Sequence, residues 1–223
     1  MMSWEGYDMR ARIMASIFTL VLVLAASSAS AQSDLYNNGP INGDYDAWTI
    51  NEGFAVSDSF TLTAGSSSLN GLSFGAWLAQ PGDVLESVDV SITSSEFGGT
   101  TYFDQTVSFT QTNCQTGSFG LPVCTETGSF PVVQLGPGTY WLNLQNAVVN
   151  NGDPVYWDEN SGAGCTSPGC PSLASESSVG SIPSESFTIL GSSSSGGSTP
   201  EPGSLLLFGS GIVGVTGWLR RRA

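Results

Sequence analysis

Apolar and polar residues alternate with a period of two along most of the middle of the chain. Every second residue is apolar between residues 72 and 78, and the run 84–92 repeats the pattern. Such alternation is typical of strands with one buried face. Similar segments occur at 60–63, 103–109, 130–135, 140–144, 155–157 and 187–189. No 3.6-residue periodicity interrupts them, so the sequence predicts roughly nine strands and an all-β fold class. The residues expected to face the core from the run 84–92 are Val84, Val88, Val90 and Ile92.

Turn-forming residues separate the expected strands. Examples are Gln80-Pro81-Gly82-Asp83, Gly136-Pro137-Gly138 and Asp153-Pro154. Proline and glycine at such positions favour tight turns, and many short strands without helices pack as a sandwich or a jelly roll. We therefore expect a jelly-roll-like β-sandwich ectodomain over residues 32–190.

The N-terminus is typical of a secretory signal peptide. Arg10 and Arg12 precede the uncharged run 13–26, which is followed by small residues. Ala29 and Ala31 fit the −3 and −1 positions that signal peptidase reads, which places cleavage before Gln32. The sequence thus predicts a signal peptide over residues 1–31 and export of the remainder, with translation starting at Met1 or Met9.

The C-terminus has three parts in order. A serine- and glycine-rich linker occupies residues 191–199, Pro200-Glu201-Pro202 follows, and the apolar or small residues 203–219 precede Arg220, Arg221 and Arg222. As a helix, 203–219 would span about 26 Å, near the lower limit for crossing a bilayer. The arginines should remain in the cytoplasm, so the ectodomain lies outside and contacts the membrane through this single helix alone.

This tail resembles the PEP-CTERM sorting signal, through Pro200-Glu201-Pro202, the glycine-containing apolar span and the terminal arginines. In that family an exosortase, a membrane cysteine protease of Gram-negative bacteria, processes the tail. The resemblance implies a transient inner-membrane anchor, followed by a location at the cell surface or in the extracellular matrix, and an association with exopolysaccharide and biofilm. The segments 138–147 and 155–160 also resemble ectodomains of such proteins, which implies a jelly-roll-like sandwich without known catalytic residues.

Charge and composition exclude several functions. All five basic residues are arginines at the two ends, and the chain contains no histidine. Nineteen acidic residues are present, and once Glu5 and Asp8 are set aside, seventeen remain between Gln32 and Pro202. Such a surface cannot neutralise phosphates, so we expect no nucleic-acid partner. Histidine-dependent catalysis is excluded as well, and any chemistry would have to use carboxylates.

Four cysteines, Cys114, Cys124, Cys165 and Cys170, are an even number in an exported chain, which predicts disulfides. Three connectivities are possible. Proximity in sequence favours Cys114 with Cys124 and Cys165 with Cys170. A four-cysteine zinc site is the alternative, but its usual C-x2-C spacing does not occur.

Aromatic residues offer a possible carbohydrate-binding surface. An exposed platform that stacks on sugar rings would draw on Trp77, Trp141, Tyr156 and Trp157, with Trp48 as a further member. Trp77 and Trp141 are out of phase with the neighbouring apolar faces, which indicates either exposure or contact with another layer. The competing interpretation is that these large rings fill the core.

Acidic residues in turn-rich segments are candidates for binding calcium, the one cofactor that the sequence suggests. Asp44 and Asp46 lie two residues apart, and Asp153 and Asp158 lie near further oxygen-bearing side chains. Calcium prefers such hard oxygen ligands, although no EF-hand loop is present.

Together these patterns predict an exported, non-catalytic surface or matrix protein whose partners are signal peptidase and an exosortase. The main alternative is a lectin-like module for the exopolysaccharide. A carboxylate-dependent glycan-active enzyme is a third possibility, since glycoside hydrolysis needs two facing carboxylates.

Overall fold

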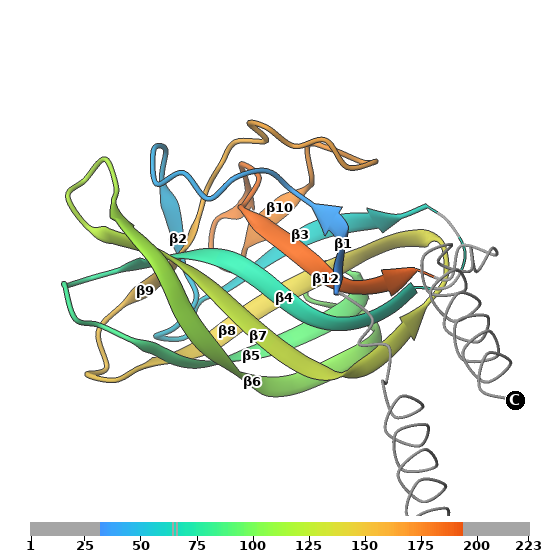
Figure 1. Cartoon of the computed structure of the whole chain (residues 1–223), viewed down its shortest axis with the longest axis horizontal. Coiled ribbons are helices and arrows are strands. Elements are labelled where there is room, and N and C mark those ends of the chain that lie inside the picture. Colours follow the sequence, from blue (N-terminus) through green and yellow to red (C-terminus); the bar gives the residue numbers. More distant parts are fainter. Residues whose placement is uncertain (1–31, 64, 66, 194–223) are drawn as a thin grey trace, which may run out of the picture. The chain divides into compact units, whose positions relative to one another are not determined.

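Strands make up most of the part of the chain that the structure describes. The computed structural model describes residues 32–63, 65 and 67–193 (Figure 1). The longer strands are β3 (Ala55–Leu62), β4 (Ser67–Leu78), β5 (Leu85–Ser95), β6 (Gly98–Thr116), β7 (Pro122–Leu135), β8 (Gly138–Val149) and β12 (Phe187–Ser193). The shorter ones are β1 (Ser33–Asn37), β2 (Ala47–Thr49), β9 (Val155–Asp158), β10 (Ala174–Glu176) and β11 (Gly180–Ile182). The predicted all-β class is confirmed.

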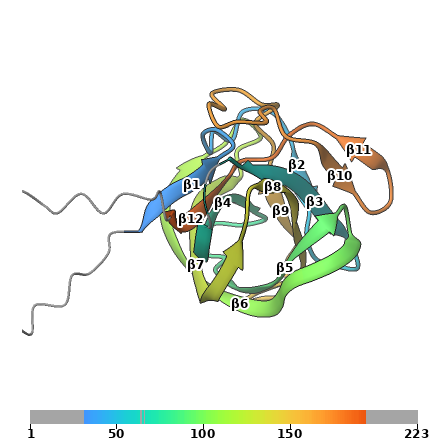
Figure 2. The same cartoon turned by 90° about the vertical axis from the view of Figure 1, so that its right-hand side faces the viewer.

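The strands belong to one curled sheet, joined through the long strand β6. The strand order is β1-β12-β4-β7-β6-β5-β8-β3-β10-β11, and β9 pairs with β4 and β2 beside it. The first part of β6, up to Ser108, pairs with β5, and the part from Phe109 pairs with β7. Figure 2 shows how the sheet closes around an interior. The two layers expected of a sandwich are therefore halves of one sheet that share β6.

The central strands pair in a nested order. β5 pairs with β6, β4 with β7 and β3 with β8, all antiparallel. This is the pairing of a long antiparallel hairpin that has folded over on itself. Within it, the neighbours β4-β7-β6-β5 have the order of a Greek key. Hairpins join the consecutive strands β5, β6 and β7, and β4 lies beside β7.

The core follows the predicted alternation closely in the long strands. Leu72, Phe74, Ala76 and Leu78 are buried, as expected. From the next segment Val88, Val90 and Ile92 are buried, but Val84 is 43% exposed. The expectation for Val84 was wrong because β5 begins only at Leu85, so Val84 lies in the preceding turn.

Trp157 lies at the centre of this core. Its side chain is completely buried, and its ring contacts those of Phe74 and Phe187 with centroid distances of 6.0 and 5.6 Å. Its indole Nε1 donates a hydrogen bond to the backbone carbonyl of Ser186 at 2.8 Å. Trp157 therefore joins β9, β4 and the start of β12.

The two disulfides have the pairing that sequence proximity favours. Cys114 near the end of β6 is bonded to Cys124 in β7, and Cys165 is bonded to Cys170 in the long segment before β10. The first joins neighbouring strands, and the second closes a short loop. No cysteine is left free to form a zinc site.

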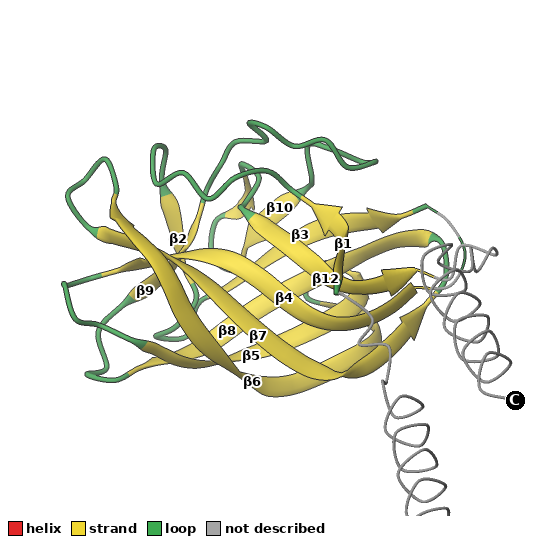
Figure 3. Cartoon of the chain, in the orientation of Figure 1, coloured by secondary structure: helices red, strands yellow, loops and turns green. Residues whose placement is uncertain are grey.

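The structure changes some of the expected boundaries. The first residues of the expected linker 191–199 belong to β12, because Gly191, Ser192 and Ser193 pair with β4. Four short strands, β1, β2, β10 and β11, were not predicted. Residues 32–63, 65 and 67–193 contain no helix, and so none that is long and apolar enough to cross a membrane (Figure 3). The expected signal peptide 1–31 and helix 203–219 lie outside the described residues.

Replacing Trp157 by alanine should strongly destabilise the domain. The substitution leaves a cavity between three strands, for which we expect a loss of about 3–5 kcal/mol in the free energy of unfolding, measured by urea denaturation. The control is Leu173→Ala, because Leu173 is 73% exposed and its truncation should change stability by no more than about 0.5 kcal/mol. Equal denaturation midpoints for the two variants would contradict this description of the core.

Candidate functional site

An unusual number of carboxylates lie inside this domain. The sequence has no basic residue between Gln32 and Pro202, so none of them can form an ion pair with a side chain of that region. Buried charges are costly unless they are hydrogen-bonded or neutralised by protons or cations. The buried acidic residues are Asp58, Asp83, Glu126, Asp158, Glu159, Glu176 and Glu185.

Asp158 is the best satisfied of these carboxylates. Its Oδ1 accepts hydrogen bonds from the indole of Trp77 at 2.6 Å and from the backbone amide of Gly43 at 3.1 Å. Its Oδ2 accepts from the amide of Asn42 at 3.1 Å and from the hydroxyl of Ser186 at 3.0 Å. Burial raises the pKa of Asp158, and these hydrogen bonds oppose that rise. The carboxylate thereby fixes the loop before β2 to β9 and β4.

Glycine at position 75 makes this arrangement possible. A Cβ atom there would lie only 2.7 Å from the Cβ of Asp158 and 2.7 Å from the hydroxyl of Ser186. A larger residue in β4 would therefore push the carboxylate away from its donors.

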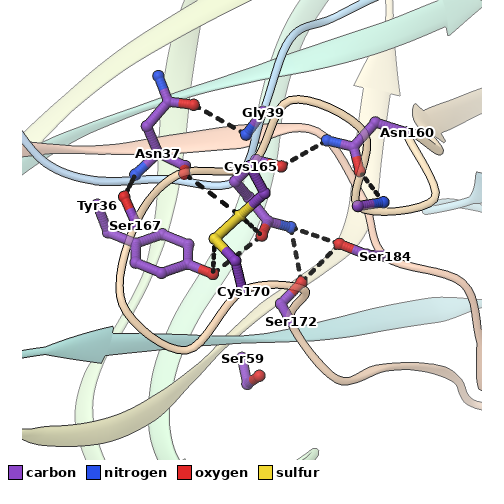
Figure 4. Close-up of a disulfide and its surroundings, with 12 residues drawn as sticks. Tyr36, Asn37, Gly39, Ser59, Asn160, Cys165, Ser167, Cys170, Ser172 and Ser184 are labelled. Carbon is purple, nitrogen blue, oxygen red and sulfur yellow. Dashed lines mark hydrogen bonds between the residues drawn. A yellow bond between two sulfur atoms is a disulfide. The ribbon is translucent and has the colours of Figure 1, made fainter.

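A second polar network, which includes Tyr36, Ser172 and Ser184, lies beside the Cys165–Cys170 disulfide (Figure 4). Asn38 organises it. The side-chain nitrogen of this fully buried residue lies 2.6 Å from the hydroxyl of Ser172 and 2.8 Å from that of Ser184. Its side-chain oxygen accepts a hydrogen bond from the hydroxyl of Tyr36 at 2.9 Å. The network connects the end of β1 with the long segment that precedes β12.

Asp58 and Glu185 lie next to this network. One oxygen of Asp58, Oδ2, accepts hydrogen bonds from Asn38 at 3.3 Å and from the backbone amide of Glu185 at 2.8 Å. Burial raises the pKa of Asp58 to about 7, although hydrogen bonds from Ser172 and from the backbone of Glu185 and Ser59 act against it. Burial, followed by the charge of Asp58 and those of three further acids, raises the pKa of Glu185 well above its ordinary value.

Glu126 is buried in a different part of the core. It lies in β7 opposite Phe74 in β4 and Gln111 in β6, and neither of its side-chain oxygens has a hydrogen-bond partner. Burial alone raises its pKa to about 7. Glu126 is therefore an isolated buried carboxylate, whereas Asp58 and Glu185 lie beside each other.

The structure divides the aromatic residues proposed as a sugar platform. Trp77 and Trp157 are buried, at 2% and 0% exposure, so neither can present its face to a sugar. Trp157 points into the core, and Trp77 is covered by the hairpin between β6 and β7. Trp48, Trp141 and Tyr156 are partly exposed. They do not form one surface, because Trp141 lies in β8 beside β3 and β5, whereas Tyr156 lies in β9 beside β2 and β4.

A different aromatic surface lies at the tip of the β6–β7 hairpin. Phe119 is 67% exposed, and its ring lies over Trp77 with a centroid distance of 5.6 Å. Tyr45, in the loop before β2, is also exposed, and that loop meets the hairpin through a hydrogen bond from the amide of Ser118 to the carbonyl of Gly43 at 2.8 Å. We call Tyr45, Trp77 and Phe119 the aromatic end. Sequence reasoning missed it because Tyr45 and Phe119 lie in loops.

The acids proposed for calcium are not brought together. Asp44 and Asp46 are exposed, Asp158 is occupied by its four donors, and Asp153 accepts hydrogen bonds from Gln80 and Asn151. Within residues 32–63, 65 and 67–193, no group of three or more Asp, Glu, His or Cys side chains has a geometry suited to a metal ion.

A pocket with a volume of about 310 Å³ lies beside the Cys114–Cys124 disulfide. Two of its polar side chains are hydrogen-bonded to nearby backbone: Gln111 donates to the carbonyl of Asp83 at 3.2 Å, and Gln115 donates to the carbonyl of Asn42 at 3.1 Å. Asp83 is the single acid among the residues that line it.

Residues 198–222 match the family model of the PEP-CTERM protein-sorting motif. The chain carries a PEP-CTERM sorting motif. No curated protein matches the chain. The motif implies export, processing by an exosortase, and a location at the surface or outside the cell. The resemblance of the tail to this sorting signal is thus confirmed, with Pro200, Glu201, Pro202 and Arg220–Arg222 inside the matched range.

The buried acids of the described domain should make its stability depend on pH. The pKa of Glu126 rises from 4.5 to about 7 on folding, so its neutral form contributes stability below pH 4.5, and this contribution is lost as the pH rises through about 7. The wild type should therefore lose roughly 1–3 kcal/mol relative to Glu126→Gln between about pH 5 and about pH 8. Denaturation curves of both proteins at these pH values test this. A stability difference that does not change with pH would show that Glu126 does not titrate in this range.

Proposed function

We propose that this protein is an exported, non-catalytic component of the cell surface or extracellular matrix. The observation that carries the proposal is the PEP-CTERM motif at residues 198–222, which follows directly on an all-β domain. In this proposal, residues 203–219 hold the protein transiently in the inner membrane until an exosortase processes the tail. The domain then associates with exopolysaccharide in a surface layer or biofilm.

A non-catalytic role agrees with the distribution of carboxylates. Glycoside hydrolysis requires two carboxylates that face each other across a cleft that substrate can enter. The pocket beside Cys114–Cys124 has Asp83 as its one acid, and that acid accepts hydrogen bonds from Gln80 and Asn151. Asp58 and Glu185 are adjacent but have no exposure to solvent. These placements support a binding or structural role over an enzymatic one.

Processing is tested by replacing Pro200-Glu201-Pro202 with three alanines in the native host. We expect the variant to accumulate at full length in the membrane fraction, whereas the wild type yields a shorter product at the surface or in the medium. As a control, Ser194, Ser195 and Gly196, which precede the matched residues, are replaced by alanine and should leave processing unchanged. Normal processing of the Pro-Glu-Pro variant would contradict an exosortase-dependent role.

The aromatic end favours a second candidate, a lectin-like contact with the exopolysaccharide. Sugar rings pack their C–H faces against exposed aromatic rings. Phe119 offers such a ring, and it packs against the ring of Trp77. The indole of Trp77 is held in place by its hydrogen bond to Asp158. In Figure 1 the β6–β7 hairpin lies at the end of the sheet opposite to the C-terminal end of β12.

Replacing Phe119 by alanine tests the lectin-like candidate. Binding of the purified full-length chain to the host exopolysaccharide should weaken by about two- to tenfold in Kd, because a single aromatic contact is lost. Val179→Ala is the matched control, since Val179 is similarly exposed, at 61%, in the β10–β11 turn. Equal Kd values for wild type and Phe119→Ala would exclude the aromatic end as the binding surface.

A further inference from the structure

Two adjacent buried carboxylates have oxygens that no group in the described domain satisfies. Glu185 is fully buried, and neither Oε1 nor Oε2 has a hydrogen-bond partner. Asp58 is fully buried as well, and its Oδ1 is unpartnered. The amide of Glu185 donates to the other oxygen of Asp58 at 2.8 Å, which places the two residues side by side. Three acceptor atoms therefore remain without a donor in one region of the interior.

The surrounding acids already have their donors. Glu159, which opposes Glu185 in an antiparallel bridge, accepts from the indole of Trp48 at 3.2 Å and from the hydroxyl of Ser161 at 2.7 Å. Asp158 accepts from four donors, as described above. Asp46 is exposed to solvent. The capacity to bind a further positive group thus lies on Glu185 and Asp58.

A proton alone does not satisfy this pair. Protonation removes the charge of Glu185, but it brings no donor to the second oxygen of that carboxyl group, which has no hydrogen-bond partner in the described domain. No basic side chain exists between Gln32 and Pro202 to supply the positive charge from within the domain. A divalent cation would balance the two negative charges, and Oδ1 of Asp58 and both oxygens of Glu185 are free to bind one.

We propose that Glu185 and Asp58 form a buried calcium site that joins β3 to the segment before β12. Calcium accepts six to eight oxygen ligands in irregular geometry, whereas magnesium requires a nearly octahedral set and retains its waters. Two carboxylates and neutral oxygens suit calcium better. The hydroxyls of Ser172 and Ser184, 2.7 Å apart and bonded to the same amide of Asn38, are neutral oxygens of the adjoining network.

Of the four acids that the sequence suggested for calcium, Asp158 and Asp46 act on Glu185 through their charges, but neither supplies one of the three free oxygens. The ion would tie Asp58 in β3 to Glu185, and so would hold the long segment that precedes β12 onto the sheet. The ion would stabilise the exported domain whatever the aromatic end binds.

The test is calcium binding by the purified full-length chain after removal of metals with a chelator. Equilibrium dialysis with metal analysis should find one calcium ion per chain. Thermal unfolding should shift upward by roughly 5–10 °C at a hundredfold excess of calcium over its Kd, with a smaller shift for magnesium. No bound calcium at millimolar concentration, or no shift in Tm, would overturn the proposal whatever the variants do.

Variants then locate the ion. Glu185→Gln and Asp58→Asn should abolish the calcium-dependent shift in Tm, with the fold checked by circular dichroism. Two controls should retain both the shift and the stoichiometry: Glu126→Gln, which removes an equally buried but isolated carboxylate, and the double variant Asp44→Asn/Asp46→Asn, which removes the exposed loop acids. Loss of binding in the double variant, or its retention in a folded Glu185→Gln, would place calcium elsewhere and overturn this assignment.

Discussion

The interior of this domain has to accommodate carboxylates without any basic side chain. Most folds neutralise a buried acid with lysine, arginine or histidine, and here the sequence offers none between Gln32 and Pro202. Backbone amides, hydroxyls and indoles take that role. Asp158 uses four such donors, and Glu176 accepts hydrogen bonds from the amides of Ser178 and Val179 and from the hydroxyls of Ser177 and Ser178. At Glu176 desolvation raises the pKa, but the hydrogen bonds together outweigh it, and the pKa is lowered.

These polar connections explain how the irregular parts of the chain become part of the fold. The loop before β2 is attached through Asp158, and the long segment between β9 and β12 is attached through Asn38 and the Cys165–Cys170 disulfide. Both segments lack the continuous apolar alternation of the central strands. Directional hydrogen bonds to buried groups hold them where hydrophobic burial is insufficient.

The regular part of the fold could be predicted from the sequence, and its exceptions had physical causes. Alternation identified the long strands because each buries one face. It missed β10 and β11, since three-residue strands are too short to show a period. Asp58 was overlooked although it occupies an inward position between Val56 and Phe60 in β3, and an acid in the apolar phase of a strand is itself a signal. Its neighbour Glu185 could not be inferred, because 127 residues separate the pair.

The pairing of the first strand, β1, with the last strand, β12, also has a mechanical consequence. Ser33 in β1 pairs with Gly191 in β12, and β12 is bonded to β4 on its other side. Detaching β12 would break the hydrogen bonds on both of its edges, so β12 is harder to remove than a strand at the edge of the sheet. The strand nearest in sequence to the sorting motif is thus held firmly by the sheet.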